Sequence, residues 1–565
     1  MGNGETKRRE LLGRLYTGGD LELAVKLMDG LLVKWASRGR CDVGPLTEKD
    51  CMLIAYGDSL QEEGRPPLAV LDEFIEKNCG EEITNVHLLP IFPYTSDDGF
   101  SVSDYLAVAP DLGGWDEVEA LGEKRGVMLD AVINHTSKSH IWFKKCCAGE
   151  FPYTQYYIEC DPGADYSRVT RPRALPLLTP FETSRGKKWY WTTFSEDQID
   201  LNYQCPYLLR DVLEVLLTYA WRGARFIRLD AIGFAWKRPG TTCMHLAETH
   251  ALIRLMRLML TEIFPGTRII TETNVPHKEN ISYFGRGDEA HMVYQFPLPP
   301  LVLHTMLTGN TDRLTAWAAG LAADPLPAGS TFFNFLASHD GIGVRPVEGI
   351  LTEEELQALL RAVADRGGRV SYKQNADGSE SPYELNISYL DAVSDPGEPD
   401  ETCAARFLAS QAIMLSLQGM PGIYYHSLLG SRNWQEGVES TGIFRRINRE
   451  KLPCRVLEEE LYREGTLRNR VFTGYRSLLR ARGGCAAFAP RVPQEILNCG
   501  SSVFGLCRRP EDGGRPLLVL INVTGRPVRL AVPVQGKDIL EGGVAVRIDR
   551  MNPYQIAWLE QPGGR

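Results

Sequence analysis

The chain has 565 residues, of which 43% are hydrophobic and 24% charged, a composition typical of a soluble globular protein with two or three domains. Its formal charge of −10 argues against nucleic acid or an anionic membrane as the main partner, and the N-terminal segment lacks the apolar core of a signal peptide or membrane anchor. The 13 cysteines include no CxxC pair, which favours reduced thiols in a cytoplasmic protein over a disulfide framework.

The first segment of the chain is predicted to be helical. Leucines and other apolar residues recur at helical spacing over residues 5–37, and the Gly18-Gly19-Asp20 sequence divides this pattern into two helices. We therefore expect an N-terminal helical extension over residues 1–46, packed on the main body of the protein.

From residue 51 onward, short apolar runs alternate with longer helical stretches, a pattern typical of parallel βα units. Eight such runs predict a closed (β/α)8 TIM barrel over residues 47–136 and 205–490. The predicted strands are 52–56, 85–92, 126–133, 224–229, 268–271, 291–296, 331–337 and 422–425.

Two gaps between the predicted strands are too long to be simple loops. The first, residues 137–204, is rich in aromatic residues and proline and is predicted to form an inserted subdomain. The second, residues 341–400, is also predicted to hold an insertion, with a helix over 352–364 and then a polar loop, KQNADGSESPYELN. Residues 491–565 are predicted to form a C-terminal all-β domain, with strands at 503–506, 516–522, 528–534, 544–547 and 555–559.

Charged residues interrupt the fourth predicted strand. Arg228 and Asp230 are two positions apart, so both side chains project from the same face of a strand. They form either a structural ion pair near the strand end or a catalytic carboxylate that its arginine keeps ionised by lowering its pKa.

Other predicted strands also end in polar residues: the third leads into His135, the fifth into Glu272 and the seventh into His339 and Asp340. Active sites of such barrels lie at the carboxyl ends of the strands, where these side chains converge. Two carboxyl groups suit glycosyl transfer, with Glu272 as a proton donor whose pKa neighbouring carboxylates raise. Each histidine either donates a hydrogen bond to a sugar hydroxyl or serves the core, and the polar neighbours favour the first role.

Four segments, DAVINH, ARFIRLDAIG, ITETN and ASHDG, look like the signature segments of glycoside hydrolase family thirteen, the α-amylase superfamily, in order and spacing. The resemblance covers about residues 50–560. It implies that the insertion at 137–204 is domain B and that the insertion at 341–400 carries the acceptor loop. It implies Asp230 as nucleophile, Glu272 as general acid/base and Asp340 as the residue that stabilises the transition state. It also implies a retaining double displacement through a covalent glucosyl-enzyme.

The segments LPIFPYTSDDGFSVSDY, RPRALP and FRRINRE are similar to those of the sucrose phosphorylase branch of this family. That similarity implies that Asp97 binds glucose hydroxyls and that Arg445 and Arg173 contact glucose or phosphate. Lys237 is a further candidate cation. The alternative for each arginine is a salt bridge at the surface or between domains. The expected substrate-binding residues are Asp97, Phe100, His135, Arg173, Arg228, Lys237, His339, Tyr383, Glu384 and Arg445.

Tyr105 and the YELN segment at 383–386 depart from the sucrose phosphorylases and look more like the glucosylglycerate phosphorylases. This implies cleavage of 2-O-α-glucosyl-D-glycerate by inorganic phosphate to α-D-glucose 1-phosphate. Phosphorylases of sucrose, glucosylglycerol or sucrose 6-phosphate remain alternatives, as does an α-glucoside hydrolase or transglucosidase. The intact carboxylates disfavour a non-catalytic relative. We expect an α-glucoside and phosphate as partners, no cofactor or metal, and a monomer or homodimer.

Overall fold

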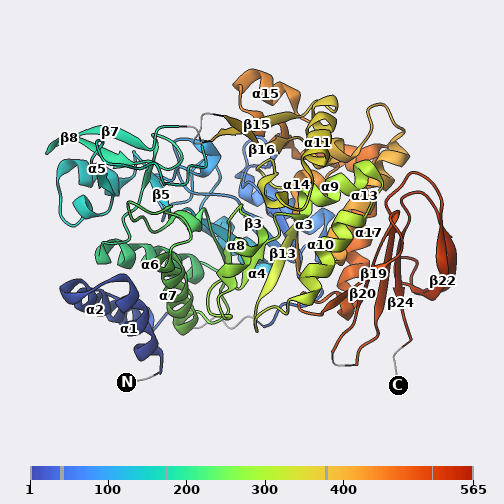
Figure 1. Ribbon diagram of the computed structural model, residues 1–565, viewed down its shortest axis with the longest axis horizontal. Coiled ribbons are helices and arrows are strands. Elements are labelled where there is room, and N and C mark those ends of the chain that lie inside the picture. The colour runs from blue at the N-terminus through green and yellow to red at the C-terminus, as the bar shows by residue number, and fades with distance from the viewer. Residues whose placement is uncertain (1–2, 39–43, 174, 376–378, 512, 563–565) are drawn as a thin grey trace.

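The computed structural model describes residues 3–38, 44–173, 175–375, 379–511 and 513–562. Eight parallel strands form a closed barrel in the order β1-β17-β13-β12-β11-β10-β4-β3, and helices surround it (Figure 1). All eight runs predicted from the sequence are strands of this barrel, so the predicted (β/α)8 architecture is confirmed. The strands are β1 (Met52–Ala55), β3 (Asn85–Leu88), β4 (Gly126–Ala131), β10 (Ala224–Leu229), β11 (Arg268–Thr271), β12 (Met292–Tyr294), β13 (Thr331–Phe335) and β17 (Met420–Tyr424).

The barrel strands were recognisable because parallel strands covered by helices are buried on both faces and therefore form nearly continuous apolar runs. Every residue of β1, β3, β12, β13 and β17 is buried. The longer helices of the barrel are α3 (Pro67–Asn78), α4 (Trp115–Lys124), α6 (Pro206–Trp221), α7 (Ala247–Ile263), α9 (Leu298–Thr308), α10 (Asp312–Ala323), α13 (Asp400–Ser416) and α17 (Leu467–Gly483). Shorter helices are α8 (His277–Ile281), α12 (Tyr389–Val393), α14 (Tyr425–Leu428), α15 (Gln435–Thr441) and α16 (Cys454–Leu461), and β2 (Leu60–Gln61) pairs with β18 (Leu452–Pro453).

The N-terminal segment forms two helices, α1 (Asn3–Leu15) and α2 (Gly18–Trp35), which pack against α7 and α6 respectively (Figure 1, blue). The break between them lies at Tyr16 and Thr17, just before the predicted position, because Gly18 already begins α2. The Tyr16 hydroxyl donates a hydrogen bond to the backbone oxygen of Tyr203, at 2.8 Å. This contact joins the helical pair to the body of the protein.

The first insertion, after β4, contains two small antiparallel sheets that lie at the upper left of Figure 1. One pairs β5 (His135–Ser137) with β9 (Gln198–Asp200), and the other contains β6 (Glu159–Cys160), β8 (Gly186–Trp191) and β7 (Leu178–Thr183). Helix α5 (Ile141–Ala148) packs against β7. The aromatic residues that marked this segment in the sequence form part of its core, in which the Phe143 and Tyr190 rings meet edge to face with centroids 5.3 Å apart.

The second insertion begins with β14 (Ile342–Gly343) and contains α11 (Glu353–Asp365), which matches the predicted helix. The prediction of a polar loop here is wrong, because most of its described residues form strands β15 (Arg369–Gln374) and β16 (Glu380–Asn386). These two strands are antiparallel and join β14 in one sheet. Residues 376–378 of the predicted loop lie outside the described part. Polar residues of this hairpin face a cavity and not an apolar core, so the alternation that marks a half-buried strand is missing.

The C-terminal segment is an antiparallel sheet in the order β19-β20-β21-β24-β22-β23, at the right of Figure 1 (red). The five strands predicted here are confirmed. The sequence did not reveal β19, whose residues are mostly exposed or half-buried and therefore carry a weak apolar signal. The strands are β19 (Gln494–Asn498), β20 (Val503–Arg508), β21 (Leu517–Asn522), β22 (Val528–Asp538), β23 (Val544–Met551) and β24 (Ile556–Glu560).

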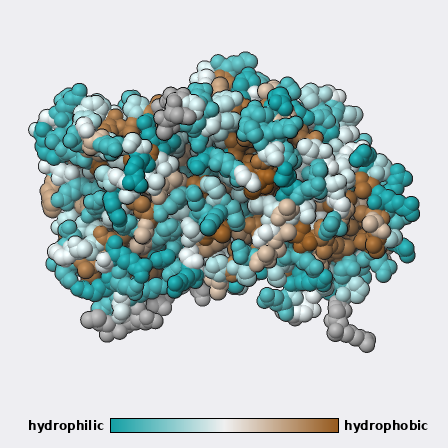
Figure 2. All heavy atoms as spheres, in the orientation of Figure 1, coloured by the Kyte–Doolittle hydropathy of each residue, from teal (hydrophilic) through white to brown (hydrophobic). Residues whose placement is uncertain are grey.

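The surface of the molecule is largely hydrophilic on the face shown in Figure 2, with apolar areas scattered among polar ones. Within the described ranges, no helix combines the length and the apolar character that crossing a membrane requires. The cysteines in those same ranges are all free thiols.

Candidate active site

The site is organised around Arg228 on β10. In the barrel, Arg228 lies directly opposite Asp130 on the neighbouring strand β4. Its Nη1 donates hydrogen bonds to Asp130 Oδ1 and to Asp230 Oδ1, the latter at 2.9 Å. The side chains of Arg228 and Asp230 therefore share one face of the strand end, as the spacing of two residues predicted.

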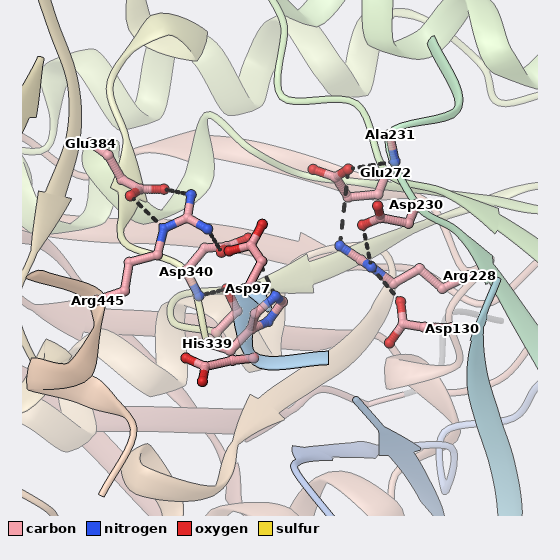
Figure 3. A network of polar contacts seen from close by, with 12 residues as sticks. Asp97, Asp130, Arg228, Asp230, Ala231, Glu272, His339, Asp340, Glu384 and Arg445 are labelled. Atoms are coloured by element: carbon pink, nitrogen blue, oxygen red, sulfur yellow. Dashed lines mark hydrogen bonds and ion pairs between the residues drawn. The ribbon is translucent and has the colours of Figure 1, made fainter. Parts of the chain in front are cut away.

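Glu272 lies beside Asp230 because the pairing of β10 with β11 continues past the strand ends. The Glu272 N–H donates to the Leu229 carbonyl at 3.1 Å, and Glu272 Oε2 accepts a 3.1 Å hydrogen bond from the Ala231 N–H. Ala231 adopts a left-handed conformation, φ 47° and ψ 29°, which costs an alanine about 1 kcal/mol or more. Figure 3 shows Asp130, Asp230 and Glu272 turned toward the guanidinium of Arg228.

The pKa values of the two neighbouring carboxyl groups are both raised. Burial raises the pKa of Asp230 to about 8, and the charge of Glu272 adds to this rise. Arg228 lowers the pKa of Asp230 as predicted, but its effect is smaller than the combined rise, so burial outweighs it and the net shift is upward. Burial also raises the pKa of Glu272. Two such groups titrate together and hold a proton between them near neutral pH.

The position of Arg228 favours one assignment of that proton. Arg228 Nη1 is hydrogen-bonded to Asp230 at 2.9 Å, whereas its Nη2 lies 4.0 Å from Glu272 Oε2. A direct charge-assisted hydrogen bond stabilises a carboxylate more than a longer contact does. The negative charge of the pair therefore belongs on Asp230 and the proton on Glu272.

A second group of charges forms the opposite side of the site (Figure 3). Arg445 Nη1 lies 2.6 Å from Asp340 Oδ1, while its Nε and Nη2 donate to the two carboxylate oxygens of Glu384 at 3.0 and 2.9 Å. Burial alone would raise the pKa of Asp340, but Arg445 and other nearby cations hold it well below its usual value. Asp340 is therefore ionised at every physiological pH.

Tyr383 and Glu384 both line the catalytic cavity although they are consecutive residues of β16. Consecutive strand residues normally point to opposite faces. Here Ser371 of β15 opposes Glu384 while Tyr372 opposes Pro382, so Tyr383 is the extra residue of a β-bulge. A bulge redirects side chains, which explains why both residues reach the same cavity.

The floor of the cavity carries aromatic and histidine side chains. The Phe100 ring stacks on His339 with centroids 4.9 Å apart, and His339 Nε2 lies 3.5 Å from Asp340 Oδ2. His135 donates from Nε2 to the Phe100 carbonyl at 2.8 Å, so this nitrogen supports the loop that carries Asp97. Arg173 Nη2 donates to Asp97 Oδ2 at 2.9 Å.

The residues predicted to act on substrate meet, with one exception, in a single cavity of about 120 Å³. Those that line it are Asp97, Phe100, His135, Arg173, Arg228, Asp230, Glu272, His339, Asp340, Tyr383, Glu384 and Arg445.

Lys237 is the exception and does not line this cavity. It is buried, with Nζ 2.5 Å from Asp200 Oδ2 and donating to Asn134 Oδ1 at 2.7 Å. The role expected for it as a phosphate or acceptor cation is therefore wrong, since its charge is already neutralised by a carboxylate. Sequence proximity to Asp230 did not reveal this partner, which comes from β9 of the first insertion.

Several residues of the site were missed by the sequence interpretation. His87 lies near the carboxyl end of β3, where polar residues of the site were expected, so the sequence could have identified it. Its Nε2 lies 2.7 Å from Asp130 Oδ2. Gln198 donates to Asp97 at 3.2 Å from an inserted strand that carries no motif. Arg449, in the FRRINRE segment, lies 3.5 Å from Asp340 and also pairs with Asp98. Further residues that line the cavity and that the sequence interpretation missed include Phe194, Asn274, Tyr294 and Asn448.

The described residues contain no group of three or more histidine, cysteine, aspartate or glutamate side chains arranged to hold a metal ion.

Comparisons with known proteins agree with this arrangement. The catalytic-domain model of α-amylase matches residues 80–340. A glucosylglycerate phosphorylase of Spirochaeta thermophila is 49% identical over 532 residues, covering 92% of this chain and 89% of the relative. A sucrose phosphorylase of Streptococcus mutans is 28% identical over 492 residues, 85% of this chain and 96% of the relative.

Among solved structures, the fold is similar to that of a sucrose 6F-phosphate phosphorylase from Thermoanaerobacter thermosaccharolyticum, with a TM-score of 0.74 and 23% identity. The alignment covers 91% of this chain and 99% of that structure. With the barrel, the converging carboxyl groups and these similarities together, the chain belongs to the α-amylase family, in the branch that contains the glucosylglycerate and sucrose phosphorylases.

Proposed function

We propose that the protein is a retaining phosphorylase that transfers the α-glucosyl unit of 2-O-α-glucosyl-D-glycerate to inorganic phosphate, producing α-D-glucose 1-phosphate and D-glycerate. The observation that carries this proposal is the single cavity that combines Asp230, Glu272 and Asp340 with Arg173 and Arg445. The relative named glucosylglycerate phosphorylase, 49% identical over most of the chain, supports glycerate as the leaving group over fructose.

In the first step, the carboxylate of Asp230 attacks the anomeric carbon while Glu272 gives its proton to the departing glycerate oxygen. The C–O bond to glycerate breaks and a glucosyl ester of Asp230 forms. The direct Arg228 contact supports Asp230 as the ionised partner, and the raised pKa of Glu272 supports it as the acid. Asp340, held ionised by Arg445, stabilises the oxocarbenium-like transition state.

In the second step, a phosphate oxygen attacks the anomeric carbon, the ester bond to Asp230 breaks, and Glu272 accepts the phosphate proton. A phosphate dianion beside three carboxyl groups needs cations, and arginine offers bidentate geometry for it. Arg173 and Arg445 line the cavity and pair with Asp97, Asp340 and Glu384. The proposed substrate-binding roles are glucose hydroxyls on Asp97 and phosphate on the two arginines.

The test compares glucosylglycerate cleavage with and without phosphate, and synthesis from α-D-glucose 1-phosphate with D-glycerate, fructose, glycerol and fructose 6-phosphate in parallel. We expect phosphate-dependent release of α-D-glucose 1-phosphate and phosphate release with glycerate as the preferred acceptor. Equal cleavage without phosphate would instead establish a hydrolase. Preference for fructose, glycerol or fructose 6-phosphate would establish the corresponding alternative phosphorylase.

The proposed location is the cytoplasm, where the free thiols of the described residues remain reduced. A monomer or homodimer stays the prediction for the oligomeric state. Fractionation of source cells and light scattering of the purified protein measure these two properties.

A further inference from the structure

A second cavity, called here the outer basin, adjoins the catalytic one. Its volume is about 610 Å³, and it lies between residues of the first insertion, within 164–173 and at 177, and residues of the second insertion. Pro172, Arg173 and Tyr383 line both cavities, so the two meet at these residues. The outer basin is therefore next to the cavity that contains Asp230 and Glu272.

The outer basin is strongly basic although the whole chain has a formal charge of −10. Among its described lining residues, none is acidic and the basic ones are Arg171, Arg173, Arg345 and Lys373. Arg173 is already paired with Asp97 at 2.9 Å. The remaining cations lack comparable partners, which makes the basin a place for an anion.

Arg345 and Lys373 are two partly buried cations of the outer basin that have no close carboxylate partner. The nearest carboxylate oxygen to Arg345 is that of Glu348, 3.9 Å from Nε, and this buried Nε has no hydrogen-bond partner. Lys373 has no ion-pair partner among the described residues. Burial lowers the pKa of Lys373, the charge of Arg345 lowers it further, and the Glu348 carboxylate opposes this shift. Two cations that share one carboxylate in this way keep a net positive charge, which favours binding an anion.

Both cations are attached to the sheet that carries Tyr383. The Val344 N–H, immediately before Arg345, donates to the Tyr383 carbonyl at 3.2 Å. Lys373 on β15 opposes Ser381 on β16, two residues from Tyr383. The β14-β16-β15 sheet thus fixes the two cations relative to the side chain that both cavities share.

We propose that Arg345 and Lys373 bind the carboxylate of the leaving group and thereby make the enzyme selective for acidic acceptors. The inference rests on the proposed function, because it names the residues that recognise glycerate. A neutral acceptor such as glycerol would leave these two partly buried cations without a partner. Leaving such charges unpaired costs binding free energy, so the site binds a neutral acceptor much more weakly than an acidic one. Selection for the carboxylate thus comes from outside the catalytic cavity.

The experiment uses α-glucosyl fluoride as donor, which glucosylates Asp230 without requiring glycerate, and offers D-glycerate, glycerol or inorganic phosphate as acceptor. The variants are Arg345→Gln, Lys373→Gln and the double variant, with Lys373→Arg as the conservative replacement. Lys187→Gln serves as control, because Lys187 is an exposed lysine on strand β8 that lines neither cavity.

We expect each glutamine variant to raise the KM for glycerate about tenfold or more, the effect of losing one charge-assisted hydrogen bond, with kcat nearly unchanged. The KM for glycerol and the hydrolysis of α-glucosyl fluoride should stay as in the wild type, and Lys373→Arg should restore most of the affinity for glycerate. Lys187→Gln should match the wild type with every acceptor.

Three results would overturn the proposal. An unchanged KM for glycerate in the double variant would show that Arg345 and Lys373 do not bind the carboxylate. An equal rise in the KM for glycerol would show that the variant has lost structure generally. A rise for phosphate with an unchanged glycerate KM would assign the basin to phosphate. A wild-type enzyme that glucosylates glycerol but not glycerate would refute the proposed function itself, and this result is obtained before any variant is compared.

Discussion

At the scale of single residues, the site depends on the sharing of one guanidinium among three carboxyl groups. Arg228 contacts Asp130 and Asp230 and lies 4.0 Å from Glu272. Asp130, Arg228 and Asp230 are buried and Glu272 is half-buried, so each charge depends on its neighbours more than on water for stabilisation. This arrangement explains how two chemically similar carboxyl groups, Asp230 and Glu272, can act as a nucleophile and as an acid.

Glu272→Gln should reduce phosphorolysis of glucosylglycerate by at least a thousandfold, because glycerate cannot depart without a proton. The same variant should still form the glucosyl-enzyme rapidly from α-glucosyl fluoride, whose leaving group needs no protonation. Burst kinetics with both donors measure this difference. Asp230→Asn is the control and should be inactive with both; an equal loss with both donors in Glu272→Gln would contradict the acid role.

The raised pKa of Asp230 also predicts an effect on stability. The pair of Asp230 and Glu272 holds its shared proton up to about pH 8, the value to which the pKa of Asp230 is raised, whereas the ordinary pKa values of the two groups are 3.8 and 4.5. The folded protein therefore binds this proton more tightly than the unfolded chain, and the contribution of the pair to stability falls as the pH rises between these values. Asp230→Asn removes this dependence and should raise the Tm at pH 8 relative to the wild type, with a smaller difference at pH 5.

Asp340→Asn provides the opposite case, because the pKa of Asp340 is lowered and its charge stabilises the fold at neutral pH. Its Tm should fall at pH 8. Thermal unfolding followed by circular dichroism at both pH values compares the two variants. A lower Tm for Asp230→Asn at pH 8 would show that the ion pair with Arg228 outweighs burial.

At the scale of elements, the hairpin of β15 and β16 links the two cavities. The bulge at Tyr383 brings Tyr383 and Glu384 to the catalytic cavity, while Lys373 lines the outer basin. The hairpin packs tightly on Gly341, where an added Cβ would lie 2.5 Å from Glu384 Cγ and 2.7 Å from the Leu385 carbonyl. Glycine at this position therefore keeps Glu384 in place for Arg445.

Gly341→Ala should displace Glu384, loosen its contact with Arg445, and lower kcat/KM about tenfold or more, since a shift of 1 Å in a positioned group has effects of this size. Steady-state kinetics measure the loss. Gly320→Ala is the matched control, because a Cβ there meets nothing within 4 Å in helix α10. It should leave activity unchanged and add about 0.5–1 kcal/mol of stability. Full activity in Gly341→Ala would show that the hairpin moves freely.

At the scale of the whole molecule, segments far apart in the chain are joined around the barrel. The outer basin lies between the two insertions, and the N-terminal helices pack on α6 and α7. Arg8 connects these helices to the barrel, because it contacts Asp29 at 2.9 Å and Glu262 at 3.0 Å. The N-terminal helices are thus a structural addition that takes no part in lining either cavity.

Leu12→Ala should lower the free energy of unfolding by about 2–5 kcal/mol, because Leu12 is completely buried and its truncation leaves a cavity. The kcat and KM values should remain those of the wild type. Urea denaturation and steady-state assays measure these quantities. Val33→Ala is the control, since Val33 is 79% exposed, and it should change stability by less than about 0.5 kcal/mol. A change of kcat in Leu12→Ala would connect the helices to catalysis.

The sequence alone determined the barrel and the converging carboxyl groups. Buried parallel strands leave continuous apolar runs, and polar residues at their ends meet at one edge of the barrel, so the convergence of Asp230, Glu272 and Asp340 follows from these patterns. Most of the C-terminal strands were also predicted from the local pattern of apolar and turn residues. Strands of this kind are set by residues close together in the chain, so the periodicity of the sequence indicates them.

Only the tertiary structure decided the partner of Lys237, the strands and bulge within the predicted polar loop, the net pKa shift of Asp230 and the outer basin. Asp200 neutralises Lys237 across 37 positions of sequence, and the basin joins Arg171 to Lys373 across two insertions. Contacts of this kind depend on how separate segments pack, and burial depends on everything around a group. The sequence shows which charges are present, whereas folding determines which of them remain unpaired for a ligand.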